Sequence, residues 1–226
     1  TEGIFDWLTS TFVQVGMTEY QIYRGIQTLI DERGYGYSWE RAGNPIVNCG
    51  PDSQAGHGLP SNQIALGHGH ILHIDLGVAT RNYSSDIQRC WYVGTDVPEH
   101  VKHAMAAVVS AIDAAAAVLR PGVQGWMVDA AAREAITAAG YPEYMHAVGH
   151  QVGRNPHDGG TLLGPQWERY GNAPDGFVEA REVYTLELGI ELPHVGIVSI
   201  EEMVIVTASG CEFLTVRQTE MWLLQR

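Results

Sequence analysis

The sequence predicts an α+β fold in a single domain spanning residues 1–226. Residues 71–77 and 83–93 alternate apolar and polar side chains around a short polar loop, which is typical of a β-hairpin. Strands are also expected at 182–188 and 197–206, and helical patterns precede both pairs of strands. This order would allow two related halves around one site, and no linker divides the chain.

The chain starts in a helical pattern within residues 1–15, which resembles the remainder of a longer helix. A second helix is predicted over 18–33, where Thr18 can cap the N-terminus and Gln21 occupies the capping-box position. Gly34 is expected to end it. The first pattern places three large apolar residues on one face: Phe5, Leu8 and Phe12.

Glycine and proline mark the remaining boundaries. Residues 43–69 are rich in Gly, Pro, Asn and Ser, which predicts turns around one short strand at 46–48. A long helix rich in Ala and Val is expected to start near Pro98 and to run to about Leu119. The later elements are a helix at 126–139, a strand at 145–149 and a long loop at 154–176.

Composition excludes several classes of partner. The chain has 26 Asp and Glu against 13 Lys and Arg, a net charge of −13, which argues against binding to nucleic acid or anionic membranes. The longest apolar stretch, 104–119, is interrupted by Ser110 and Asp113 and is shorter than the ~20 residues of a membrane span. Residues 1–10 do not resemble a signal peptide, and three widely spaced cysteines imply no disulfide framework. We therefore expect a cytoplasmic protein.

Four carboxylates and one histidine are the candidate metal ligands. Asp75 and Asp86 fall on one face of the first hairpin, whereas Glu187 and Glu201 stand among apolar residues of later strands. Buried carboxylates are costly unless they are paired or bind a cation, and four together repel one another. With His150, they form an oxygen-rich donor set that suits two divalent cations such as Mn, Co or Zn. Two such ions can bridge a water and clamp a substrate oxygen.

Short motifs surround these residues in a fixed order. They are HIDLG and NYSSDIQR, with two aspartates eleven residues apart, GHQVG with His150, NPHD with His157, TLELG with Glu187, and IEE with Glu201. Together they resemble the catalytic domain of the pita-bread metallopeptidases of family M24, which include methionine aminopeptidase, aminopeptidase P and prolidase. The resemblance covers nearly the whole chain. It implies a pita-bread fold, with pseudo-symmetric halves around a curved antiparallel sheet.

The resemblance implies a role for each candidate ligand. Asp75 would chelate one metal ion, while Asp86 and Glu201 would bridge both ions. His150 and Glu187 would complete the coordination of the second ion. Glu187 would also accept the proton of the bridging water.

Three histidines are implied on the substrate side. His57, in a Gly-rich turn eighteen residues before Asp75, matches the substrate-side histidine of the family. His157 is expected to polarise the scissile carbonyl or to steady the tetrahedral intermediate. For His146, contact with substrate and packing within a strand are equally open.

The implied function is a dinuclear metal-dependent exopeptidase that hydrolyses the N-terminal peptide bond through a metal-bridging hydroxide. Xaa-Pro bonds, as cut by prolidase and aminopeptidase P, are the first expectation. Ser199 stands where prolidase-like members usually have Arg, Leu188 replaces a proline and Gln151 replaces a glycine. The serine weakens the case for strict Xaa-Pro specificity. A methionine aminopeptidase-like enzyme, a small-molecule C–N hydrolase and a non-catalytic peptide-binding domain of the same fold stay open.

The expected partner is a peptide substrate, and neither nucleic acid nor membrane is expected. Aminopeptidase P and prolidase carry an extra N-terminal domain, which methionine aminopeptidases lack. Because the chain starts within a helical pattern, we expect a catalytic domain whose N-terminal domain was cleaved or omitted. A homodimer is kept open.

Overall fold

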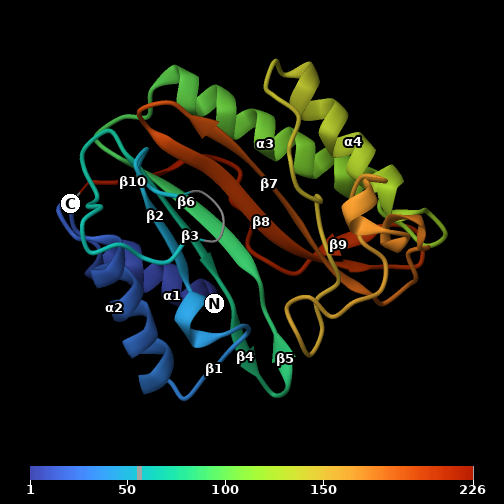
Figure 1. The fold of residues 1–226 in the computed structure, drawn as a ribbon, viewed down its shortest axis with the longest axis horizontal. Coiled ribbons are helices and arrows are strands. Elements are labelled where there is room, and N and C mark those ends of the chain that lie inside the picture. The colour runs from blue at the N-terminus through green and yellow to red at the C-terminus, as the bar shows by residue number, and fades with distance from the viewer. Residues whose placement is uncertain (55–57, 226) are drawn as a thin grey trace.

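Strands at the centre of the fold form three sheets, with helices packed around them (Figure 1). The computed structural model describes residues 1–54 and 58–225. In spatial order, the first sheet consists of β1 (Gly36–Tyr37), β4 (Val78–Thr80) and β5 (Tyr83–Ser84). The second consists of β10 (Trp222–Leu224), β6 (Ile87–Val93), β3 (Ile71–Leu76) and β2 (Ile46–Cys49). The third consists of β7 (Val183–Leu192), β8 (Gly196–Val206) and β9 (Cys211–Phe213). Among these strands, β10 and β6 are parallel and the other neighbours are antiparallel.

Two pairs of helices cover different sheets. α1 (Glu2–Trp7), continued by a π-helical turn at Leu8–Phe12, and α2 (Glu19–Glu32) lie beside the sheet of β2, β3 and β6. α3 (Glu99–Val118) and α4 (Gly125–Ala138) lie across β7 and β8 (Figure 1). The short helical turns of the described chain are Arg41–Gly43, Glu168–Tyr170 and Ala173–Asp175.

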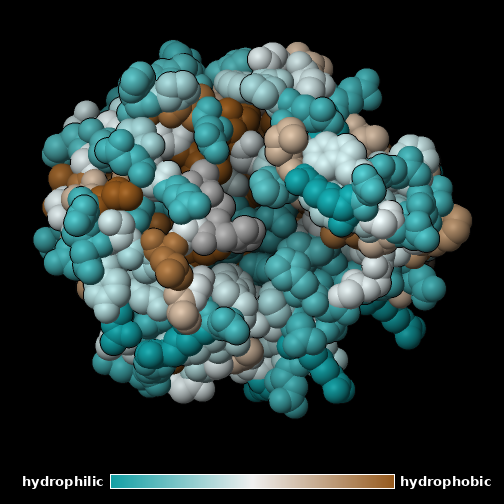
Figure 2. All heavy atoms as spheres, viewed as in Figure 1, coloured by the Kyte–Doolittle hydropathy of each residue, from teal (hydrophilic) through white to brown (hydrophobic). Residues whose placement is uncertain are grey.

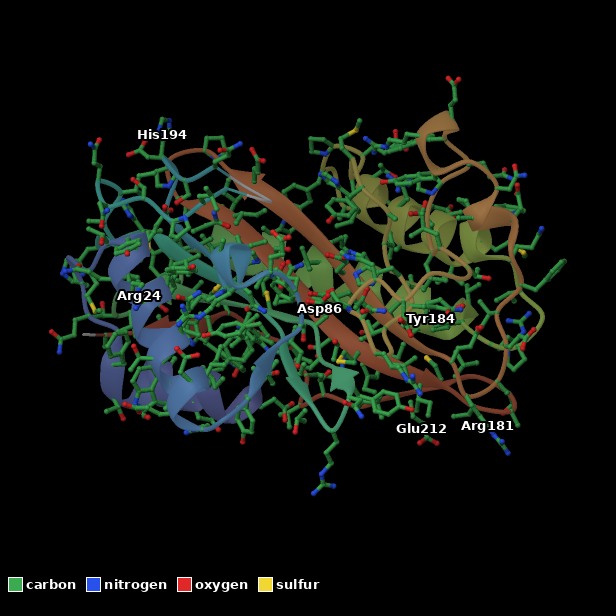
Figure 3. All side chains as sticks on the ribbon, turned by 60° about the horizontal axis from the view of Figure 1, so that its bottom comes forward. Arg24, Asp86, Arg181, Tyr184, His194 and Glu212 are labelled. Atoms are coloured by element: carbon green, nitrogen blue, oxygen red, sulfur yellow. The ribbon has the colours of Figure 1, made fainter. Side chains whose placement is uncertain are left out.

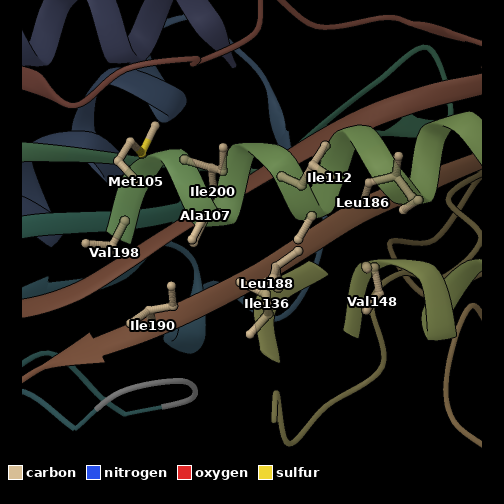
Figure 4. Packing of buried hydrophobic residues seen from close by; sticks show 14 of the residues in the cluster. Met105, Ala107, Ile112, Ile136, Val148, Leu186, Leu188, Ile190, Val198 and Ile200 are labelled. Carbon is tan, nitrogen blue, oxygen red and sulfur yellow. The ribbon is translucent and has the colours of Figure 1, made fainter. Parts of the chain in front are cut away.

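The buried apolar side chains form two clusters, one beneath each pair of helices. One cluster joins α3 and α4 to the long strands and includes Ile112 of α3 with Leu186 and Leu188 of β7 (Figure 4). The other joins α1 and α2 to the first hairpin and includes Ile26 and Ile74. Each half therefore consists of a hairpin backed by helices, as the order of elements in the sequence predicts.

Local signals set the bounds of several elements. At the start of α2, Gln21 N donates to Thr18 Oγ1 at 3.2 Å and Thr18 N donates to Gln21 Oε1 at 2.9 Å, which confirms the capping box. Gly34 follows the helix at φ +68°, a conformation that glycine adopts without steric cost. Both predicted hairpins are confirmed, since β3 pairs with β6 and β7 pairs with β8.

The strand predicted at 145–149 is wrong in its position. Pairing with β7 begins at Val148, whose carbonyl accepts a hydrogen bond from Glu187 N at 2.7 Å. Upstream of it, the guanidinium of Arg133 in α4 binds the carbonyl of His146 at 2.9 Å. The Arg133 side chain thus donates to a carbonyl that a neighbouring strand would otherwise satisfy. Alternation along the sequence does not reveal such a contact between distant residues.

Two further features differ from the sequence prediction. The loop expected at 78–82 contains β4, because the end of the first hairpin pairs with β1. β10, which was not expected, pairs in parallel with β6. Both pairings join segments that are distant in sequence, so short-range patterns do not predict them.

α3 is the one helix in the described part of the chain that is long and apolar enough to cross a membrane. Its apolar residues belong to the buried cluster with α4, β7 and β8. A core helix passes the same test of length and composition, and the packing of α3 agrees with this interpretation.

Candidate metal centre

The four predicted carboxylates meet where β6 packs against β8. Strand register places Glu187 directly opposite Glu201. Asp75 lies near the end of β3, opposite Gln88, and Asp86 immediately precedes β6. Figure 3 shows Asp86 in the middle of the molecule, between the elements of the two halves.

His150 completes the group. Its Nε2 atom lies 3.5 Å from Glu187 Oε1 and 3.8 Å from Asp86 Oδ2. The same atom lies 3.9 Å from Glu201 Oε1. Ligand atoms of Asp86, His150 and Glu201 fall within 4.8 Å of one another, so one cation could contact all three.

A glycine allows His150 to approach the sheet. A Cβ atom on Gly149 would lie 2.0 Å from the carbonyl oxygen of Thr185, so this position excludes a side chain. Thr185 N donates to the carbonyl of His150 at 2.9 Å, and His150 N donates to Thr185 Oγ1 at 3.2 Å. The backbone of His150, the second residue of the GHQVG motif, is therefore fixed beside β7.

Burial and mutual repulsion raise the pKa of three of the carboxylates. Burial, followed by the charge of Glu187, raises the pKa of Asp75 to about 8. Burial also raises the pKa of Asp86 and of Glu201 well above the usual range, and neighbouring carboxylates add to the effect. Ionised together without a cation, these three carboxylates would destabilise one another.

Glu187 and His150 form the charged pair of the group. Burial acts to raise the pKa of Glu187, but hydrogen bonds with His150 and Gln88 outweigh it and hold this pKa below its usual range. Burial acts to lower the pKa of His150, and the adjacent Glu187 carboxylate outweighs it and raises this pKa. A carboxylate that stays ionised inside the protein is suited to bind a cation or to accept a proton.

Unsatisfied oxygen atoms provide a direct test of whether the residues fit a metal. Asp75 Oδ1 and Glu201 Oε2 are buried and have no hydrogen-bond partner among residues 1–54 and 58–225. A buried oxygen without a donor carries a desolvation cost of about 1–3 kcal/mol, which a coordinated cation would remove. The donor set and its orphaned oxygens therefore fit divalent metal binding.

A buried ion pair braces the same junction from the opposite face of the strands. Arg89 of β6 donates to Glu202 Oε2 of β8 at 2.9 Å, and both side chains are almost fully buried. Arg89 also donates to the carbonyl oxygen of Glu201 at 2.8 Å. Asp86 and Glu201 thus sit on two strands that Arg89 holds together.

The predicted histidines fall in different places. His157 is exposed, and its ring centroid lies 4.1 Å from that of His150, so it stands at the edge of the carboxylate group. His146 is also exposed and packs its ring against Tyr144 at 5.5 Å. His57 lies outside the described residues.

Four residues near the site are not among the predicted site residues, and the sequence points to Ser199 only as a departure from the usual family pattern. Tyr144 lies within electrostatic reach of the group, because burial and then the charges of Glu187 and Glu201 raise its pKa. The other three each lie two positions from a candidate ligand, on the same strand face: His73, Gln88 and Ser199. Period-two alternation from the ligands would have identified these three.

A cavity of about 310 Å³ opens further along this region of the sheet, beside the β7–β8 turn. Asn48, Glu191, His194 and Ile197 are among its lining residues. His194 lies at the outer end of the long hairpin in Figure 3. Hydrophilic residues cover most of the face in Figure 2, which is hollowed near its middle. The cavity offers room for a polar ligand at this end of the long hairpin, and none of the five candidate ligands lines it.

Known proteins are similar to this chain in sequence and in fold. The chain is 30% identical over 206 residues to an uncharacterised peptidase from Staphylococcus epidermidis, and 30% identical over 207 residues to an Xaa-Pro dipeptidase from Pyrococcus horikoshii. Each alignment covers 91% of this chain and 55% of the relative, so the chain spans about half the length of these relatives.

A crystal structure of an X-Pro aminopeptidase from Thermotoga maritima superposes with a TM-score of 0.85 at 28% identity. The superposition covers 98% of this chain and 59% of that one, and it confirms the predicted pita-bread fold. Residues 1–208 match metallopeptidase family M24, and the chain belongs to this family.

Proposed function

We propose that the chain is the catalytic domain of a dinuclear metal-dependent exopeptidase that hydrolyses the N-terminal peptide bond before proline. The convergence of Asp75, Asp86, His150, Glu187 and Glu201 carries the proposal. Relatives named Xaa-Pro dipeptidase, at about 30% identity, support the choice of substrate.

Two divalent ions, Mn, Co or Zn, would be the cofactors. Asp75 would hold one ion, Asp86 and Glu201 would bridge both, and His150 and Glu187 would hold the second. Bound ions would supply Lewis-acid activation of a water molecule and of the scissile carbonyl.

The side chains of the protein would carry the proton and orient the substrate. Glu187 stays ionised beside His150 and would accept a proton from the attacking water. His157, exposed at the edge of the group, would donate to the developing oxyanion. His57 and His146 would contact the substrate.

We also propose that residues 1–226 act as one catalytic domain in the cytoplasm. A second copy of the chain and an N-terminal domain are proposed partners besides the peptide. The greater length of the relatives supports the N-terminal domain. The mass of the purified full-length protein in solution tests both proposals, the second copy and the N-terminal domain.

The function is tested with protein stripped of metal and then reloaded with Mn, Co or Zn. Metal content is measured together with hydrolysis of Xaa-Pro dipeptides, longer Xaa-Pro peptides and Met-peptides. We expect two ions per chain and cleavage of Xaa-Pro bonds only after reloading. Preferential cleavage of Met-peptides would instead support a methionine aminopeptidase, and metal binding without any hydrolysis would support a peptide-binding domain.

A further inference from the structure

A buried glutamine connects the proposed proton acceptor to a second row of polar side chains. Gln88 Nε2 donates to Glu187 Oε2 at 2.9 Å. Its Oε1 accepts from Ser199 Oγ at 2.7 Å and lies 3.1 Å from His73 Nε2. His73 Nδ1 in turn lies 2.9 Å from Asn48 Oδ1. Each polar atom of the Gln88 amide group therefore has a partner.

These contacts fix the orientation of the amide. A rotated amide would direct Gln88 Oε1 at the Glu187 carboxylate, and two acceptors would then face each other. A neutral His73 can donate its single N–H to Gln88 Oε1 or to Asn48 Oδ1, but not to both. Ser199 Oγ is therefore the donor that holds Gln88 Oε1. Ser199 thus holds the donor end of Gln88 toward Glu187.

The strands provide the space for this arrangement. Gly189 lies opposite Ser199, and a Cβ atom on Gly189 would approach both Ser199 Cβ and Oγ to 2.9 Å. The small serine leaves room for Gln88 and supplies the hydroxyl that holds it.

The two oxygens of Glu187 consequently face different partners. Oε1 points toward His150 Nε2 at 3.5 Å, and Oε2 is bound by Gln88. Without this hydrogen bond, the carboxylate could rotate about its terminal torsion, which has a broad energy profile.

We propose that Gln88 is a positioning residue that fixes which oxygen of Glu187 faces the metal ions, and that Ser199 acts through Gln88. The expected fall in kcat rests on the proposed function, whereas the expected change in metal coordination does not. With Gln88 in place, Glu187 offers Oε1 to the metal and keeps Oε2 turned away. Without Gln88, both oxygens reach the metal.

The test combines Gln88→Leu with Co(II) titration followed by visible absorption, which reports the coordination number directly. We expect Gln88→Leu to bind Co(II) with a weaker absorption band, because a second Glu187 oxygen raises the coordination number. In the peptide assay, kcat should fall by about 10- to 100-fold, as for other residues that orient a metal ligand. KM should stay within about threefold, because Gln88 does not touch the substrate.

Gln27→Leu is the matched control. Gln27 is a fully buried glutamine of α2 that donates to the carbonyls of Arg41 and Asn44, away from the carboxylates. Its replacement should lower the melting temperature and leave the Co(II) spectrum and kcat unchanged. If Gln88→Leu behaves in the same way as this control, the inference is overturned.

Ser199→Ala is a milder variant that tests whether Ser199 acts through Gln88. It should change the spectrum and kcat in the same direction as Gln88→Leu, but less. Because Ser199 acts through Gln88, the double variant should be no worse than Gln88→Leu alone. Multiplicative losses in the double variant would contradict this route.

The outcomes separate the two proposals. If the unmodified protein binds Co(II) but cleaves no Xaa-Pro peptide, the proposed function fails while the spectral change in Gln88→Leu still supports positioning. If the unmodified protein cleaves these peptides and Gln88→Leu matches it in spectrum and kcat, positioning fails while the function stands.

Discussion

Metal binding should release protons from the carboxylate group, because burial raises the pKa of three of its members. Asp75, with a pKa of about 8, would remain protonated in about nine of ten molecules at pH 7. Asp86 and Glu201 are also shifted upward by burial and neighbouring charge. A coordinating carboxylate must lose its proton, so we expect at least about one proton to leave when the site fills at pH 7.

Calorimetric titration in two buffers of different ionisation enthalpy measures this number. If two protons leave, the affinity for metal should fall about a hundredfold when the pH drops from 7 to 6. Asp75→Asn provides a comparison, because it removes one titrating group and should release one proton fewer. Release of less than one proton, with an affinity that does not change with pH, would refute the electrostatic reasoning.

The same pKa shifts predict how the metal-free protein responds to pH. A group whose pKa is raised by folding stabilises the protein below its unfolded pKa and loses that contribution as the pH rises through the folded value. For Asp75 this interval runs from about pH 4 to about pH 8, and the loss is on the order of 5 kcal/mol. The melting temperature in EDTA should therefore fall between pH 5 and pH 8, and added metal should restore it. A melting temperature that rises steadily to pH 8 without metal would contradict this sign.

Three further variants test other parts of the site. Asp86→Ala should abolish binding of both ions, measured by metal analysis, because a bridging ligand serves both; full occupancy would remove its bridging role. His157→Ala should retain its metal while kcat falls about ten- to a thousandfold, as on loss of an oxyanion contact; loss of metal instead would make His157 a ligand. Arg89→Met should lower the free energy of unfolding by about 3–5 kcal/mol, because Glu202 would remain buried without its partner. Denaturant unfolding measures this change against exposed Arg33→Met, which should stay within about 0.5 kcal/mol.

Alternation in the strands is the part of the sequence that predicts the site. In the first hairpin it places Asp75 on the same face as Gln88, and the observed register pairs these two residues. It also identifies Glu187 and Glu201 as polar residues inside apolar strands, and both prove to lie in the group around His150. A strand has only two faces, so a few residues are enough to assign one of them.

Contacts between distant segments are the part that alternation does not predict. The segment before His150 is held by Arg133 of α4 in place of a strand neighbour, and nothing near His146 in the sequence signals it. Gln88, Ser199 and His73 could each be placed on the ligand face, but their mutual hydrogen bonds depend on how β6 meets β8. Such pairings require the register of both hairpins at once.

The junction between β6 and β8 explains why stability and metal binding should be linked in this protein. Asp86 stands at the start of β6 and Glu201 lies within β8, so an ion bound to both ties the two hairpins together. On the other face of the same strands, Arg89 and Glu202 form a buried ion pair. The metal-free junction then has attraction on one face and repulsion on the other. Raising the pH strengthens only the repulsion, because the carboxylates ionise while the arginine stays charged. Metal should therefore protect this junction most in alkaline solution, where the carboxylates bind it most tightly.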